Sequence, residues 1–180
     1  TGRAVGRWTD EGAVGTTTVA LGGRSGRDGY LGGDRWVAVG SSAGIVNIYD
    51  RRAWAVAAAA ADNNGVPPRP TPTRTLDNLT TPISHLAFSP DGQVLVMASR
   101  WKQDALRLVH LPTCTVFKNW PTQSTPLGRV SSVAFGTVVA AAASRGEEGK
   151  DGKEVGVGGG ELWLAVGSEQ GKVRLWEIRS

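Results

Sequence analysis

The sequence holds few side chains of the kinds that bind transition metals or act as nucleophiles and bases. It has two histidines, His85 and His110, and one cysteine, Cys114. His110 and Cys114 are close in sequence, but a proline lies between them, and no second Cys or His pair completes a tetrahedral zinc set. The glycines of "GVGGGE" (156–161) lack the strand and helix that frame a dinucleotide-binding loop, and no Gly-Lys-Ser/Thr phosphate loop or Gly-x-Ser-x-Gly nucleophile elbow is present. The sequence therefore predicts no catalytic residue, no metal site and no cofactor.

The stretch "SRWKQDA" (99–105) is a better candidate for a functional site, because it joins an aromatic residue to two cations. Arg100, Trp101 and Lys102 would together meet phosphate or an acidic protein surface, with the tryptophan as the anchor. The alternative is a tryptophan that folds back on the neighbouring sheet and two solvated charges. The sequence alone leaves both interpretations open.

A second group of cations surrounds a proline-rich stretch. Arg51 and Arg52 precede it, and Arg69 and Arg74 lie within it. These arginines would contact RNA phosphate if the stretch became ordered on binding; the alternative is that they are solvated. The formal net charge of +4 permits an acidic partner such as nucleic acid, although the sequence has no long Lys/Arg block.

Composition limits the compartment and the size of the ordered core. A single cysteine cannot form an internal disulfide, and no secretory signal opens the sequence, so a reducing cytosolic or nuclear compartment is expected. The 25 glycines gather mainly in residues 1–33 and 146–160, which predicts that residues 1–34 are mostly flexible and that the ordered part is well short of 180 residues. The first residue is Thr1, which suggests part of a longer chain.

The elements that would position these side chains come from an internal repeat. "VAVGSSAGIVNIYD" (37–50) and "LAVGSEQGKVRLWEI" (164–178) superpose without a gap, and "VLVMASRWKQDALRLVHL" (94–111) is a third copy with two extra residues in its turn. Each copy reads as an apolar run, a turn and an alternating run, which is typical of a β-hairpin. The repeat aligns five positions that we interpret as structural, with the histidine in the place of the acid: Tyr49, Asp50, His110, Trp176 and Glu177.

Flanking strands extend each hairpin to four strands, at about 83–88, 94–99, 105–111 and 113–118 for the middle copy. This plan is that of a WD-repeat β-propeller blade, so an all-β fold is expected. Residues 35–180 would form the C-terminal portion of a propeller, about two and a half to three blades, since closed rings have roughly four to eight. Two insertions interrupt the repeat: 51–75, expected as one marginal helical turn and a polyproline-like linker, and 143–161, expected to be disordered.

The repeat sequences resemble one family more closely than the general pattern. "GSSAGIVNIYD" (40–50), "ISHLAFSPDGQVLVMASRWKQDALRLVHLPTCTVF" (83–117) and "LAVGSEQGKVRLWEI" (164–178) are similar to the C-terminal propeller of the U3 small nucleolar RNA-associated protein 18 family, and "RLVHLPTCTVF" is the most specific element. The resemblance covers somewhat over half of the residues; residues 1–34 and the two insertions depart from it. A family motif that recruits the exosome helicase has no counterpart in this sequence.

The resemblance implies a function without catalysis. It implies a nucleolar scaffold subunit of the small-subunit processome, in its UTP-B subcomplex, which supports precursor rRNA processing and ribosome biogenesis. The implied partners are other UTP-B subunits, U3 small nucleolar RNA and the precursor rRNA, contacted directly or through proteins, with no membrane and no small-molecule substrate. The alternative from another class is a general WD-repeat adaptor, such as a substrate receptor of a ubiquitin ligase.

Overall fold

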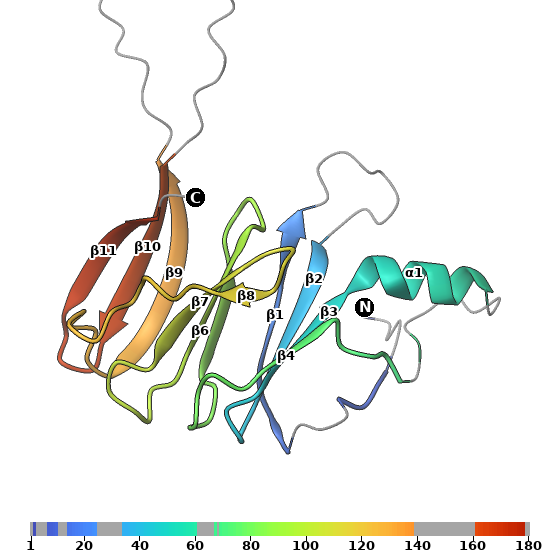
Figure 1. Ribbon diagram of the computed structural model, residues 1–180, viewed down its shortest axis with the longest axis horizontal. Coiled ribbons are helices and arrows are strands. Elements are labelled where there is room, and N and C mark those ends of the chain that lie inside the picture. Colours follow the sequence, from blue (N-terminus) through green and yellow to red (C-terminus); the bar gives the residue numbers. More distant parts are fainter. Residues whose placement is uncertain are drawn as a thin grey trace, which may run out of the picture.

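The protein, seen in a computed structural model, consists of three antiparallel β-sheets that stand side by side (Figure 1). The structure describes residues 2, 7–10, 14–24, 34–60, 67, 69–138 and 161–178. The expected disordered insertion at 143–161 lies outside these residues, except Glu161. Within the described part of the chain, no helix is long and apolar enough to cross a membrane.

The strands follow one another in order within the first two sheets, and the third sheet has three strands among the described residues. The first sheet contains β1 (Thr16–Arg24), β2 (Asp34–Ser41), β3 (Val46–Asp50) and β4 (Arg74–Leu76), with helix α1 (Arg51–Ala60) between β3 and β4. The second contains β5 (His85–Phe88), β6 (Val94–Ala98), β7 (Leu106–His110) and β8 (Thr115–Val116). The third contains β9 (Val130–Val138), β10 (Glu161–Ser168) and β11 (Val173–Ile178).

The strand registers confirm the repeat that the sequence predicted. In the central hairpins of the three sheets, Trp36 pairs with Asp50, Val94 with His110, and Trp163 with Glu177. These pairs are equivalent in the aligned repeats, so the three hairpins share one register. The WD-repeat plan of a four-stranded blade is therefore present in the first two sheets and, up to its third strand, in the third.

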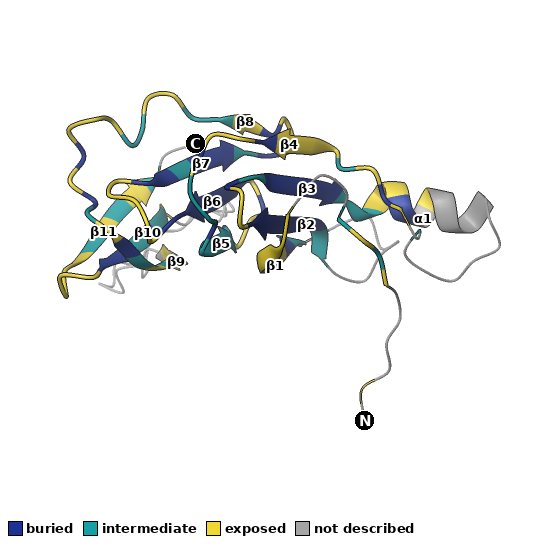
Figure 2. Ribbon diagram, turned by 90° about the horizontal axis from the view of Figure 1, so that it is seen from below, coloured by how far each residue is buried: buried dark blue, intermediate teal, exposed yellow. Residues whose placement is uncertain are grey.

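Apolar side chains fill the two spaces between neighbouring sheets. Figure 2 shows β1, β5 and β9 along one side of the molecule and β4 and β8 along the other, as in an arc of a propeller. Alternation along each strand sends one set of side chains toward each neighbouring sheet. Between the first and second sheets lie, among others, Ile48, Ile83, Leu95, Met97 and Val109; between the second and third lie Val96, Leu106, Leu108, Val130 and Leu164.

The first sheet begins earlier than the sequence suggested. Residues 1–34 were expected to be mostly flexible and outside the propeller, and for Thr16–Arg24 this is wrong, because these residues form β1 and pair with β2 along nearly their whole length. Gly22 permits this: a Cβ there would lie 2.3 Å from Phe88 of the second sheet, so only a glycine lets β1 and β5 approach so closely. The signal in the sequence was the β-branched run "TTTV" at 16–19.

The first insertion also contains more regular structure than expected. Instead of one marginal turn, residues 51–60 form a ten-residue helix. Its alanine-rich sequence has high helix propensity, and its packing through Trp54, which is buried, adds the tertiary contribution that a short helix needs. Arg74, expected in a linker, instead begins β4 and pairs with Ile48. The insertion thus returns to the sheet as its fourth strand.

Candidate interaction surface on the β6–β7 loop

The residues that join β6 to β7 lie on one end of the molecule with the other loops of the same kind. The β2–β3, β6–β7 and β10–β11 connections all lie at the lower end of Figure 1, which corresponds to the top face of a propeller. Arg100, Trp101 and Lys102 belong to the β6–β7 connection and therefore lie at this end. The chain segments that lead into β5 and β9 reach the same end, because the strands alternate in direction.

The β6–β7 loop keeps the turn geometry of the shorter copies despite its two extra residues. In those copies the residue two before the third strand is a glycine with positive φ, Gly44 at 82° and Gly171 at 72°. At the equivalent place the loop has Asp104 at φ 55°. Aspartate tolerates this left-handed conformation better than most residues because its short carboxylate bonds nearby backbone.

Hydrogen bonds hold the loop from both sides. The Asp104 carboxylate accepts the backbone N–H groups of Leu127 at 3.0 Å and Gly128 at 2.8 Å, and its own N–H donates to the Gly128 carbonyl at 2.9 Å. On the other side, the Ser84 hydroxyl accepts the Arg100 N–H at 2.9 Å, and buried Ser99 accepts the Trp101 N–H at 3.4 Å. The loop is therefore fixed against the segments before β5 and before β9.

The three predicted residues project from this fixed loop into solvent. The Trp101 side chain is 63% exposed, so it does not fold back into the neighbouring sheet. The Arg100 guanidinium lies 5.9 Å from the centre of the Trp101 ring, within the range of a cation–π contact. Arg100 and Lys102 are exposed as well. An exposed tryptophan flanked by cations on a rigid loop is an arrangement suited to binding a partner.

Two residues that sequence reasoning missed complete this surface. Glu169, in the β10–β11 turn, lies 3.8 Å from Arg100 and 3.9 Å from Arg129, which comes just before β9. All three side chains are at least 39% exposed, so these ion pairs contribute little to stability. The sequence could have indicated Arg129 as part of this surface. It directly precedes the first strand of a blade, and this position lies on the same face of a propeller as the loops between second and third strands. We call Arg100, Trp101, Lys102, Arg129 and Glu169 the loop surface.

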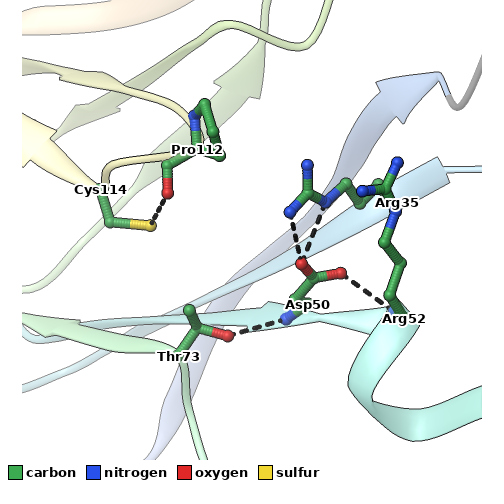
Figure 3. A network of polar contacts seen from close by, with 6 residues as sticks. All are labelled: Arg35, Asp50, Arg52, Thr73, Pro112 and Cys114. Carbon is green, nitrogen blue, oxygen red and sulfur yellow. Dashed lines mark hydrogen bonds and ion pairs between the residues drawn. The ribbon is translucent and has the colours of Figure 1, made fainter. Parts of the chain in front are cut away.

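Two of the other predicted cations, Arg51 and Arg52, lie at the start of α1. Arg51 donates to the Asp34 carbonyl at 2.6 Å, and the backbone N–H of Arg52 donates to the Asp50 carboxylate at 2.9 Å, which makes Asp50 the N-cap of α1 (Figure 3). The other carboxylate oxygen of Asp50 accepts two bonds from Arg35, at 2.6 and 3.0 Å. These arginines start the helix and tie it to β2; they do not join the loop surface.

The aromatic repeat positions pack against different partners. Trp176 faces the second sheet and meets Trp120 edge-to-face, with ring centres 5.4 Å apart. Tyr49 is fully buried on the face of the first sheet that points away from the second. It is covered there by Trp8 and Trp54, whose ring centres lie 6.3 and 5.9 Å from that of Tyr49, and its hydroxyl donates to Asp10.

The acid position of the repeat differs in each copy. Asp50 is paired with Arg35, whereas His110 shares a 2.8 Å hydrogen bond with the Thr113 hydroxyl and packs edge-to-face on Phe117. Glu177 is exposed and lines a small hollow of about 190 Å³ between the outer parts of the second and third sheets, together with Trp120 and Trp176. Among the described residues that line this hollow, Glu177 is the only carboxylate, and none carries a nucleophilic hydroxyl or thiol.

The histidine and cysteine side chains differ in their surroundings. Burial lowers the pKa of His85; a hydrogen bond with the Ser131 backbone opposes this and the charge of Arg100 adds to it. Burial raises the pKa of the Cys114 thiol, and Arg74 and Arg35 partly offset the shift. Across the described residues, no three His, Cys, Asp or Glu side chains gather closely enough to hold a metal ion.

Comparison with known proteins agrees with the architecture. Residues 70–103 match the model of the WD domain, G-beta repeat. This match, the three antiparallel sheets and their common register define a WD-repeat protein whose described part is an arc of a β-propeller.

Similar proteins identify the family within this class. U3 small nucleolar RNA-associated protein 18 of Saccharomyces cerevisiae is 46% identical over 183 residues, which cover 98% of the chain and 25% of the yeast protein. The probable U3 small nucleolar RNA-associated protein 18 of Schizosaccharomyces pombe is 43% identical over 145 residues, 81% of the chain and 22% of that protein. The homolog of Homo sapiens is 34% identical over 119 residues, 66% of the chain and 18% of the human protein. The chain belongs to the U3 small nucleolar RNA-associated protein 18 family, and it spans a quarter or less of the length of these relatives.

Proposed function

We propose that the chain is part of a scaffold subunit of the small-subunit processome, without catalytic activity, which supports precursor rRNA processing and biogenesis of the small ribosomal subunit. The observation that carries the proposal is the 46% identity to a yeast protein named for its association with U3 small nucleolar RNA, over 98% of the chain. The protein would act in the nucleolus, with UTP-B subunits, U3 small nucleolar RNA and precursor rRNA as its partners.

The geometry supports a scaffold because it offers binding surfaces on a rigid frame. Two apolar cores lock the three sheets together, so loops at one end keep fixed relative positions. The loop surface presents an aromatic side chain and several cations at that end. Binding through a few anchors on such a frame requires no reacting groups.

The experiment is affinity purification of the full-length protein from nuclear extract, followed by probing of the bound RNA. Strong enrichment of U3 small nucleolar RNA and of the 5′ part of precursor rRNA, retained at moderate salt, is the expected result. A tagged WD-repeat protein of a different complex serves as the control for RNA that binds propellers without specificity. Recovery of neither RNA would overturn the proposal.

The general WD-repeat adaptor is the competing function. It predicts recovery of a cullin-type ligase or another soluble complex in the same purification, without U3 RNA. The relatives named above favour the processome, because their names refer to U3 small nucleolar RNA.

A further inference from the structure

We propose that the loop surface binds single-stranded RNA directly, with one base stacked on Trp101. The phosphates on either side would pair with Arg100, Lys102 and Arg129. This inference deepens the proposed function and rests on it for the source of the RNA, since precursor rRNA and U3 RNA are the strands that such a subunit would meet.

Trp101 is exposed on a loop whose backbone is held in place. Tryptophan is a large side chain that folded proteins usually keep mostly buried, yet this one is 63% exposed. Ser99 accepts the Trp101 N–H, and the hydrogen bonds of Ser84 and Asp104 hold the rest of the loop, so little backbone freedom remains to be lost on binding. An aromatic face presented in a fixed position is the platform on which an unpaired base stacks.

Positive charge surrounds the Trp101 ring. The Arg100 guanidinium lies 5.9 Å from the centre of the Trp101 ring. Arg129, which precedes the first strand of the next sheet, lies close by, because both arginines pair with Glu169. Both ion pairs to Glu169 are longer than 3.7 Å and solvent-exposed, so a phosphate can replace the carboxylate at small cost. The nearest other carboxylate in the loop, that of Asp104, is occupied by two backbone N–H groups. The arrangement therefore favours an anionic partner.

The polar surroundings of Trp101 favour RNA over an acidic protein as the partner. A tryptophan that anchors a protein partner usually lies within a well-packed patch from which water is excluded. The neighbours of Trp101 in the loop are Arg100, Lys102, Gln103 and Asp104, all polar, and the facing turn contributes Glu169. A base needs only the ring face and nearby cations, because stacking requires no apolar rim.

Full-length protein and a fluorescently labelled single-stranded RNA of about ten nucleotides test the inference by anisotropy titration. We expect Trp101→Ala to weaken the affinity roughly 5- to 100-fold, which is the loss typical of one stacked base. Trp101→Phe keeps an aromatic face and should stay within about threefold of the wild type. Lys102→Ala should reduce the slope of log affinity against log salt by about 0.7, the value for one phosphate contact on a single strand.

A matched control separates this surface from general electrostatic attraction. Lys118, which follows β8, is also an exposed lysine but lies outside the loop surface. Lys118→Ala should leave both the affinity and the salt slope as in the wild type. Equal effects of Lys102→Ala and Lys118→Ala, or an unchanged affinity of Trp101→Ala, would overturn the inference.

The two proposals fail in different ways. If the wild-type protein recovers U3 RNA and Trp101→Ala binds the labelled RNA as tightly as the wild type, the scaffold stands and the RNA site does not. A Trp101→Ala protein that keeps its RNA affinity but loses a UTP-B subunit would show that the loop surface binds protein instead. If the wild type recovers no U3 RNA from nuclear extract, the proposed function itself is wrong.

Discussion

The start of α1 and the β6–β7 loop both carry a tryptophan and arginines within a few residues, yet they present these side chains in opposite ways. At the start of α1, Trp54 is only 8% exposed and Arg51 donates to a backbone carbonyl of β2. In the loop, Trp101 is 63% exposed and Arg100 has a distant, solvated ion pair. Residue types alone therefore do not define an interaction surface, because the fold decides whether their partners are already supplied.

The largest expected contrast is between the two tryptophans. We expect Trp54→Ala to lower the free energy of unfolding by about 3 kcal/mol, because it removes a buried ring that contacts Tyr49 and Trp8. Trp101→Ala should change it by no more than about 0.5 kcal/mol, since the side chain is exposed. Urea unfolding of the full-length protein, followed by circular dichroism, measures both. Similar losses in the two variants would remove the distinction between the regions.

Substitutions of Asp50 show which of its two contacts holds α1 against the first sheet. Asp50→Ala removes both the pair with Arg35 and the N-cap, and we expect a loss of about 2 kcal/mol in the free energy of unfolding. Asp50→Asn keeps a good capping side chain and loses the charge, so its loss should be about half as large. The same unfolding experiment applies. If Asp50→Asn and Asp50→Ala lower the free energy of unfolding equally, the cap contributes nothing and the ion pair with Arg35 alone holds the start of α1 against β2.

The titration of His85, which lies beside the β6–β7 loop, should make the stability of the protein depend on pH. Its Nδ1 shares a 2.7 Å hydrogen bond with the Ser84 hydroxyl that also accepts the Arg100 N–H. Because the pKa of His85 is lowered from 6.5, the unfolded chain binds more protons than the folded one between the folded pKa and 6.5. Stability should therefore fall as the pH falls through this window and stay constant above it.

The control for this pH dependence is His85→Gln, which lacks the titrating ring. Unfolding curves between about pH 5 and about pH 7.5 should show a smaller dependence in His85→Gln than in the wild type. A wild type and a variant with the same pH dependence would mean that His85 titrates as it does in the unfolded chain.

The smallest expected effect concerns the reactivity of Cys114. This side chain lies near the corner where Asp50 and Arg35 join α1 to the first sheet (Figure 3). Because burial raises the pKa of the Cys114 thiol, little thiolate is present at neutral pH and access is restricted. We expect iodoacetamide to modify this thiol much more slowly in the folded protein than in urea, as measured by mass spectrometry over time. Equal rates would show that this corner opens readily.

Much of the fold was predictable because its signals are local. The alternation of apolar residues and the Gly/Ser turns fixed the register of the three hairpins, and this register is the one observed. The exceptions were β1 and α1. The glycines around β1 led to the prediction of a flexible segment, and the alanine run of α1 was predicted to form only one helical turn. In both, the deciding contribution is packing against residues distant in sequence: Phe88 for Gly22 of β1, and Trp8 for Trp54 of α1.

The candidate site was predictable only in part. The residue types of the β6–β7 loop indicated Arg100, Trp101 and Lys102, since they join an aromatic residue to two cations. Arg51 and Arg52 were predicted as a second candidate, but the Arg51 side chain contacts the Asp34 carbonyl and the Arg52 backbone N–H contacts the Asp50 carboxylate, both at the start of α1. Arg129 and Glu169 were missed because they lie far from Trp101 along the chain.

The repeat, the strand register and the residue types available at each loop follow from the sequence alone, because they depend on spacing along the chain. Tertiary structure alone decided which tryptophan is buried and which is open to solvent. It also decided that cations from two sheets meet around Glu169 and that Asp104 fastens the loop to the segment before β9. Burial and charge pairing are sums over neighbours in space, and most of those neighbours lie far away along the chain.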